Sequence, residues 1–151
     1  MRRTLALLMA AARTRVLYES SAVSVTLEST PGDTPHLRLT ALQKVALAPA
    51  DVERVLAVSS ELLDSKSRFK SSWDLRNAVV PKPSVAWACI KWALANRKRL
   101  DASNERMSIC MPPGQHALTA VVKLVLSTCA PTNPYFCSES CEECEAFMRL
   151  E

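Results

Sequence analysis

Apolar and polar side chains alternate with a period of two near the start of this chain and follow helical spacing further on. Residues 22–28, AVSVTLE, show the alternation of a half-buried strand. The residues TPGD at 30–33 favour a turn, and residues 36–40 are predicted to form the second strand of a hairpin. A helix is predicted to begin at residues 49–51, with valine and leucine side chains on one face.

The stretch from Arg68 to Leu100 contains the repeating unit of the predicted fold: a strand, a proline-stiffened loop and a long helix. Residues 71–76 alternate as a strand does, and Asn77 with the prolines that follow it ends the strand pairing. Ser84 comes directly after Pro83, where a helix N-cap is expected, and residues of good helix propensity follow it.

The strand–helix unit recurs twice towards the C-terminus. Residues 107–111 and 135–137 are predicted to be short strands, each followed by a helix, at 115–129 and 141–150. The predicted order is β-β-α-β-α-β-α-β-α, which indicates an α/β fold with a single mixed, mostly parallel sheet flanked by helices. We expect residues 19–151 to form this one domain.

This order resembles the STAS, or SpoIIAA-like, domain fold, which the CRAL-TRIO lipid-binding fold partly shares. The segment SSWDLRN at 71–77 resembles the third strand of that group, in which an aspartate–leucine pair ends the strand. MPPG at 111–114 and CAPTNPYF at 129–136 fall where that fold has its next loops. The resemblance implies a STAS-like domain over about residues 22–151.

The start of the long helix departs from the pattern of bacterial STAS switch proteins. Those proteins carry Asp-Ser-Ser-Gly there, with a serine that is phosphorylated, whereas this chain has PKPS at residues 81–84. We therefore expect Ser84 to cap the helix and not to act as a phosphorylation switch. The chain is also shorter than CRAL-TRIO proteins, which need a longer chain to enclose a lipid.

Composition and charge exclude several classes of function. With 48% hydrophobic and 23% charged residues, the chain has the composition of a folded globular protein. It has only two glycines, too few for a glycine-rich phosphate-binding loop. Four of its 19 Lys and Arg residues lie in residues 1–18, so the rest of the chain has 15 basic and 15 acidic residues. This balance argues against a dedicated nucleic-acid-binding surface.

The first 18 residues, MRRTLALLMAAARTRVLY, are rich in arginine and contain no acid. This composition suits an organellar transit segment, and an ordinary N-terminal helix that is retained on the protein explains it equally well. A secretory signal fits less well because the apolar run is short and Arg13 and Arg15 follow it at once. The run is also shorter than the ~20 apolar residues that span a bilayer. We expect a mitochondrial location if the segment is a targeting signal and a cytoplasmic one otherwise.

Three cysteines near the C-terminus have the spacing C-x3-C-x2-C, which resembles the cluster-binding signature of radical S-adenosylmethionine enzymes. On a helix, Cys137, Cys141 and Cys144 would share one face and are the candidates for a metal or cluster site. That family places the motif early in a much longer chain, and the neighbouring glutamates would repel thiolates. We therefore expect a core-facing cysteine stripe, with no metal and no cofactor. The other three cysteines are expected to be small buried hydrophobic residues: Cys89, Cys110 and Cys129.

A small-ligand cleft is predicted where the parallel strands end, the usual binding edge of an α/β sheet. Four polar side chains are its candidates: Asp74, Arg76, Ser84 and His116. The sequence contains no nucleophile-elbow serine and no glutamate-flanked histidine pair, so we expect no catalytic activity.

The long helix has two apolar sides. One side includes Ile90 and is expected to face the sheet, and the other side centres on Trp92. Small residues around an outward tryptophan have the composition of an interface centre. A protein partner is therefore one explanation of this side, and coverage by another part of the same chain is the other. The residues of this side are Val85, Ala88, Trp92, Ala95 and Arg99.

These features predict a non-catalytic protein-interaction or structural subunit of a larger assembly, whose partners are other protein subunits. The alternative is a small-ligand or lipid carrier that uses a STAS-like or CRAL-TRIO-like cleft. Neither hypothesis needs nucleic-acid binding or a transmembrane segment.

The targeting hypothesis is tested by fusing residues 1–18 to a fluorescent reporter. If the arginine pattern is a transit signal, the reporter should enter mitochondria, and replacing all four arginines with glutamine should abolish import. A reporter that stays in the cytosol would leave only the retained-helix explanation.

Overall fold

The computed structural model describes residues 12–150, in which six strands lie side by side in the order in which they occur in the chain. β1 pairs with β2 and β2 with β3 in antiparallel fashion, and the remaining neighbours are parallel. The strands are β1 (Arg13–Glu19), β2 (Val23–Ser29), β3 (His36–Ala41), β4 (Phe69–Asp74), β5 (Asn104–Cys110) and β6 (Tyr135–Ser138). The helices are α2 (Pro49–Asp64), α3 (Pro83–Ala95), α4 (Arg97–Ser103), α5 (His116–Cys129) and α6 (Cys141–Met148).

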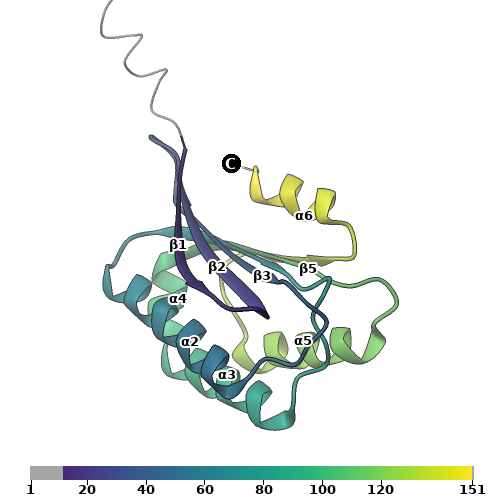
Figure 1. Ribbon diagram of the computed structural model, residues 1–151. Coiled ribbons are helices and arrows are strands. Elements are labelled where there is room, and N and C mark those ends of the chain that lie inside the picture. Colours follow the sequence, from purple (N-terminus) through teal and green to yellow (C-terminus); the bar gives the residue numbers. More distant parts are fainter. Residues whose placement is uncertain (1–11, 151) are drawn as a thin grey trace, which may run out of the picture.

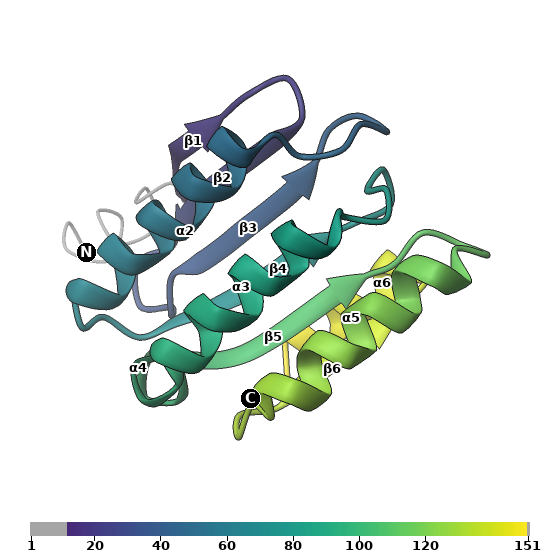
Figure 2. The ribbon, with the colours of Figure 1, turned by 90° about the horizontal axis from the view of Figure 1, so that it is seen from below.

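The helices divide unequally between the two faces of the sheet. Among the described residues, α2, α3, α4 and α5 lie on one face and α6 lies on the other (Figures 1 and 2). Crossovers of one hand that add parallel strands in one direction bring every connecting helix to the same face. α6 follows the last strand and is free of this constraint. It packs over β5 and β6, so no helix of residues 12–150 covers the rest of that second face.

Strand register gives the two faces opposite chemistry. In the parallel part, Leu39, Trp73 and Ile109 are aligned in one row, and their side chains pack towards the helix layer. The adjacent row, Arg38, Ser72 and Ser108, has the opposite orientation because successive side chains of a strand point to opposite faces. We call the face that carries this second row the polar face.

Two hydrophobic clusters form the core between the sheet and the helix layer. One joins β2, β3 and β4 to α2 and includes Val25 and Val58, and the other joins β5 to α5 and includes Ile109 and Leu118. Burying one such side chain contributes about 1.5–3 kcal/mol, so the two clusters account for much of the favourable free energy of folding. Within the described part of the chain, no helix is both long enough and apolar enough to cross a membrane.

The predicted order of strands and helices is confirmed from residue 22 onwards, and the sheet has one strand more at its N-terminal edge. Residues 13–18, which we expected in an N-terminal helix or targeting segment, lie in β1 and pair with β2. The reason is tertiary: Leu17 and Tyr18 pack against the first cluster, and the Tyr18 hydroxyl donates to Asp51 Oδ1 of α2 at 2.8 Å. Residues 1–11 of the predicted segment lie outside the described residues.

The predicted long helix is divided in two, and Ser84 does not cap it. α3 begins at Pro83, with Lys82 at the N-cap position and no capping hydrogen bond from a side chain. Proline is favoured at the first helical position, which leaves Ser84 within the first turn and exposed. Asn96 separates α3 from α4, and its side-chain amide donates to the carbonyl oxygen of Trp92 at 2.9 Å.

Candidate functional site

A cavity of about 310 Å³ lies on the polar face beside α6. Its floor is formed by β3, β4 and β5, and α6 supplies one wall. The cavity brings together hydroxyl, carboxylate, guanidinium and sulfur groups. Its lining includes Arg38, Ser72, Asp74, Arg76, Ser108, Cys110, Cys141, Cys144 and Glu145.

Arg38 forms two ion pairs, one with α6 and one with β2 of the sheet. Its Nη1 lies 2.6 Å from Glu145 Oε1 on α6, and its Nε lies 2.9 Å from Glu28 Oε2 on β2. The hydrogen bond from Arg38 lowers the pKa of Glu145, so this carboxylate is ionised at neutral pH. Arg38 and His36 alternate with Leu37 and Leu39 in the predicted strand, and this pattern in the sequence could have identified them as residues of a polar face.

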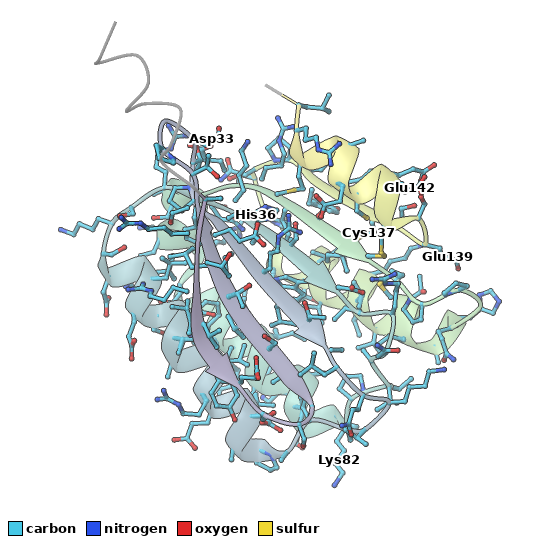
Figure 3. The ribbon with its side chains drawn as sticks, turned by 45° about the horizontal axis from the view of Figure 1, so that its top comes forward. Asp33, His36, Lys82, Cys137, Glu139 and Glu142 are labelled. Carbon is cyan, nitrogen blue, oxygen red and sulfur yellow. A yellow bond between two sulfur atoms is a disulfide. The ribbon has the colours of Figure 1, made fainter. Side chains whose placement is uncertain are left out.

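Beside Arg38, three side chains form a short hydrogen-bonded chain. His36 Nε2 lies 2.6 Å from Ser72 Oγ, which lies 3.0 Å from Ser108 Oγ (Figure 3 shows the position of His36). Burial, and next the charge of Arg38, lower the pKa of His36 to about 4. A histidine of this pKa is neutral at pH 7 and a weak base. His36 and Ser72 therefore make the hydrogen-bond contact of a histidine-activated serine, but His36 is too weak a base to activate it.

The predicted ligand cleft is only half formed. Asp74 and Arg76 do meet at the polar-face cavity, where Arg76 Nε and Nη2 lie 2.9 and 2.7 Å from the two carboxylate oxygens. This pairing lowers the pKa of Asp74. Ser84 and His116 are exposed residues at the starts of α3 and α5. These helices cover the other face of the sheet, so the expectation that all four residues share one cleft is wrong.

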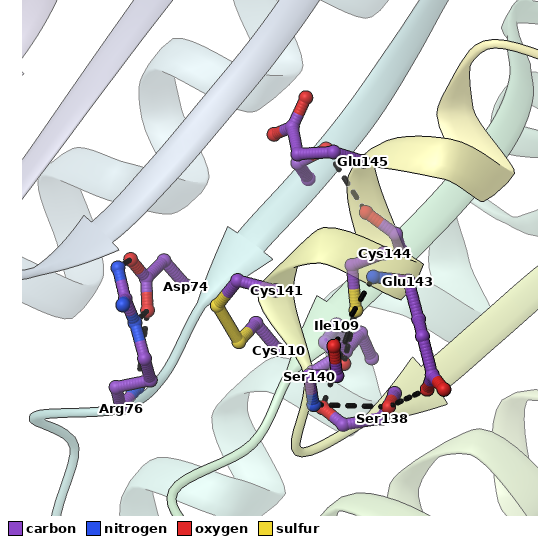
Figure 4. Close-up of a disulfide and its surroundings, with 12 residues drawn as sticks. Asp74, Arg76, Ile109, Cys110, Ser138, Ser140, Cys141, Glu143, Cys144 and Glu145 are labelled. Carbon is purple, nitrogen blue, oxygen red and sulfur yellow. Dashed lines mark hydrogen bonds and ion pairs between the residues drawn. A yellow bond between two sulfur atoms is a disulfide. The ribbon is translucent and has the colours of Figure 1, made fainter.

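A disulfide that we did not predict joins Cys110, the last residue of β5, to Cys141, the first residue of α6 (Figure 4). The expectation that Cys110 is simply a small buried hydrophobic residue is therefore wrong. Cys144 is buried and free, and burial raises the pKa of its thiol. The pair Cys141 and Cys144, separated by two residues at the start of a predicted helix, is the pattern in the sequence that could have drawn attention to sulfur chemistry.

The three candidate metal-ligating cysteines do not share one helix face. Cys137 lies in β6 and packs against the core cluster under α5, whereas Cys141 and Cys144 lie on α6. Asp74, Cys110 and Cys141 do have ligand atoms within 4.8 Å of one another. Two of these atoms are the bonded sulfurs of the disulfide, so they would offer thiolates to a metal only after reduction.

A second hollow, of about 330 Å³, lies between the sheet and the helix layer. β2, β3, β4 and β5 form one side of it, and α2, α3 and α5 form the other. Nearly all of the side chains that line it are aliphatic or aromatic. We call this space the interlayer cavity. Its lining includes Val25, Leu39, Ile109, Val55, Ala86, Ala93 and Val125.

The face of α3 that we expected to meet a protein partner is covered by α2 of the same chain. Trp92 Nε1 donates to Ser60 Oγ of α2 at 2.9 Å, and its ring packs against the first core cluster. Arg99 forms an ion pair with Asp64 of α2. The expectation of an outward Trp92 and Arg99 is therefore wrong, because intramolecular packing uses both side chains. Of the remaining residues of that set, Val85 lines the interlayer cavity, Ala88 is half-buried and Ala95 is exposed.

No model of a protein family matches this sequence, and no curated protein matches it either. Among solved structures, the chain is similar to an uncharacterised protein of the DUF3478 family from Shewanella loihica PV-4, which has a SpoIIAA-like fold. The TM-score is 0.60 at 14% sequence identity, and the match covers 85% of this chain and 95% of that one. The chain therefore has a SpoIIAA-like α/β fold, as the resemblance of its strands and loops implied.

His36 makes the stability of the domain depend on pH. Its pKa is about 4 in the folded protein, against 6.5 for a histidine exposed to water, so only the unfolded chain takes up this proton between these values. The contribution of neutral His36 to the free energy of unfolding is therefore complete above pH 6.5, and it decreases as the pH falls towards 4. Allowing for solvent screening of a half-buried ring, we expect His36→Gln to recover about 1–2 kcal/mol of the stability lost on acidification.

The measurement is urea unfolding at about pH 7.5 and about pH 4.5. His116→Gln is the matched control, because this histidine is exposed and should leave the pH dependence unchanged. If both variants lose as much stability on acidification as the wild type, His36 is not the group responsible.

Proposed function

We propose that the protein is a non-catalytic binding domain that holds an apolar small molecule, such as a lipid chain, in the interlayer cavity. The observation that carries this proposal is a hollow of about 330 Å³ with an almost wholly apolar lining inside a domain of 151 residues. Small-molecule sites typically have volumes of about 300–1,000 Å³ and are lined mainly by hydrophobic side chains.

Energetics support a bound occupant. The cavity is open at its mouth, so without a ligand its apolar lining would contact water. An apolar molecule would cover that lining, whereas water finds few hydrogen-bonding partners there.

The loops at the carboxyl ends of β3 and β4 give this cavity an apolar mouth. Val45 of the first loop lines the cavity and is 45% exposed, and Val79 and Pro81 of the second loop also line it. Lys82, at the N-terminus of α3, is the only basic residue among the described residues that line the cavity, and its side chain extends outward (Figure 3). A ligand with an apolar chain and an anionic head group would match this arrangement.

The test is binding of a fluorescent long-chain fatty acid to the purified full chain. At a probe concentration of 100 times the Kd, unfolding should require about 2.7 kcal/mol more free energy. The double variant Ala86→Leu, Ala93→Leu fills the cavity from α3 and should weaken binding on the order of tenfold or more, equal to about 1.4 kcal/mol, without loss of stability.

Ala95→Leu is the matched control, because Ala95 lies on the same helix but is exposed. The proposal fails if the wild type does not bind the probe, or if the cavity-filling variant and the control bind it equally. It also fails if the double variant is strongly destabilised, because the additional methyl groups would then have met filled space.

A second candidate is the protein-interaction subunit, with a different surface from the one expected from the sequence. Trp87 and Leu94 of α3 are 58% and 44% exposed, and Leu124 of the neighbouring α5 is 61% exposed (Figure 2). Residues seven apart on a helix lie on the same side, so the first two share one stripe. Exposed tryptophan with aliphatic neighbours is typical of the centre of a protein interface. We propose this surface as the contact if the protein is part of a larger assembly, mitochondrial or cytoplasmic.

Two tryptophans on α3 allow a matched test of this candidate. Trp92→Ala should lower the free energy of unfolding by about 3–5 kcal/mol, because it removes an internal contact with α2. Trp87→Ala should leave stability within about 0.5 kcal/mol and weaken assembly by about 2 kcal/mol. Stability is measured by urea unfolding, and assembly by the native mass of the tagged full chain in extracts of its own cells. A monomeric wild type, or an unchanged native mass for Trp87→Ala, would contradict the subunit proposal.

A further inference from the structure

Sulfur atoms gather where α6 begins over the polar face. Cys110 is the last residue of β5 and is aligned with Asp74 of β4 on one side and with Ser138 of β6 on the other. A short turn after Ser138 leads to Cys141, the first residue of α6, and the Cα atoms of the two bonded cysteines are 5.3 Å apart. The disulfide therefore ties the start of α6 to the end of β5 (Figure 4).

A third sulfur, that of Cys144, lies near the end of the same strand. Cys144 is one helical turn beyond Cys141, and its thiol lies 3.5 Å from the carbonyl oxygen of Ile109, the residue before Cys110. Residues three apart on a helix have Cα atoms about 5 Å apart. This separation falls within the range of about 4.4–6.8 Å that a disulfide can bridge. Pairing with Cys144 also requires the first turn of α6 to tighten, because Cβ atoms three residues apart on a helix are about 5–6 Å apart and a disulfide needs about 3.5–4.5 Å. We call Cys110, Cys141 and Cys144 the sulfur cluster.

The three cysteines of the sulfur cluster differ in their exposure to solvent. All three residues line the polar-face cavity, but Cys110 and Cys144 are each only 4% exposed, whereas Cys141 is half-buried. A thiol that enters the cavity therefore meets Cys141 first. Cys141 also lies at the N-terminus of α6, where unpaired backbone N–H groups stabilise the thiolate that it becomes once the disulfide is fully reduced.

The unpaired cysteines argue against a disulfide whose role is only structural. All six cysteines lie within the described residues, and four of them form no disulfide there. Proteins that depend on disulfides for their fold usually pair their cysteines fully. A single disulfide next to a free thiol in a two-residue-spaced pair is the arrangement found where disulfides exchange.

We propose that the sulfur cluster is a thiol–disulfide exchange site, with Cys141 as the sulfur that a small thiol or a protein dithiol attacks. The incoming thiolate bonds to Cys141 Sγ, the Cys110–Cys141 bond breaks, and Cys110 leaves as a thiolate that takes a proton from solvent. Cys144 loses its proton to solvent and attacks Cys141 Sγ in the mixed disulfide, which expels the incoming thiol. The net change is from a Cys110–Cys141 to a Cys141–Cys144 disulfide. If the incoming molecule is a dithiol, its second thiol can attack the mixed disulfide instead of Cys144. The dithiol is then oxidised to a disulfide, and Cys110 and Cys141 are left as free thiols.

Exchange changes how α6 is held. The disulfide is the covalent link between the start of this helix and β5. The later part of the helix is held by Arg38 through Glu145, by Arg106 through the carbonyl oxygen of Phe147 and by Lys70 through that of Met148. Loss of the Cys110 bond therefore frees the first turn of α6 while its other end stays attached, and this widens access to the polar-face cavity.

The experiment treats the purified full chain with reduced glutathione in the presence of EDTA, so that no metal protects the thiols. The reaction is quenched with acid and alkylated, and disulfides are located by peptide mass spectrometry. We expect a glutathione adduct on Cys141 followed by a Cys141–Cys144 disulfide. In Cys144→Ser the adduct should accumulate on the order of tenfold more than in the wild type, because the resolving thiol is absent.

Cys89→Ser is the matched control, since Cys89 is a free, half-buried thiol on α3, and it should behave as the wild type does. The proposal is overturned if the Cys110–Cys141 bond resists glutathione, if the adduct forms on Cys110, or if Cys144→Ser accumulates no additional adduct. If Cys144→Ser does not fold, the wild-type time course decides alone, because the site of the first adduct and the later Cys141–Cys144 bond are both visible there.

Discussion

The order in which parallel strands are added to the sheet is the constraint on which the rest of this structure depends. From β3 to β6, each strand lies beside its predecessor, and the crossovers bring α2, α3, α4 and α5 to a single face. Strand alternation then sorts the side chains, so that Leu39 and Trp73 point towards the layer of four helices while Arg38 and Ser72 point to the opposite face. One face becomes an apolar layer with an interlayer cavity, and the other becomes the polar face.

On the polar face, α6 depends on its attachments. A helix of eight residues is too short to be stable by itself in water, so its stability comes from what holds it. Ser140 accepts a hydrogen bond from the backbone N–H of Glu143 at the N-terminus, and Glu145 pairs with Arg38 of the sheet. The Cys110–Cys141 disulfide adds the covalent attachment. The disulfide holds the first turn of α6, whereas Arg38, Lys70 and Arg106 hold its later part, so a change at the disulfide acts on the first turn.

The two hollows share one wall, the C-terminal end of β4. Trp73 lines both, while its neighbour Asp74 belongs to the polar-face cavity alone. The interlayer cavity has an apolar surface and therefore suits an apolar ligand that binds through the hydrophobic effect. The polar-face cavity offers ion pairs, hydroxyls and sulfur, and suits chemistry on a thiol. A single sheet separates the two hollows, so the apolar ligand and the thiol–disulfide exchange that we propose would lie on opposite faces of it.

The sequence by itself determined the order of elements from residue 22 onwards, because strand alternation, proline-bounded loops and helical spacing are local properties of the chain. It predicted the mixed, mostly parallel sheet and placed Asp74 beside Arg76, two residues apart in the sequence. The periodicity of a helix also identified Ile90 as a core position. A local pattern cannot show which other helix or strand packs against each side of a given helix or strand.

Tertiary structure decided those questions. Trp92 belongs to the core because α2 lies next to it, which no helical periodicity could reveal. Ser84 and His116 are separated from Asp74 because the crossovers bring α3 and α5 to the opposite face of the sheet. The disulfide joins residues 31 apart, and only the meeting of a strand end with a helix start brings their sulfurs within bonding distance. Long-range contacts of this kind depend on how the layers stack, and stacking is a property of the whole chain.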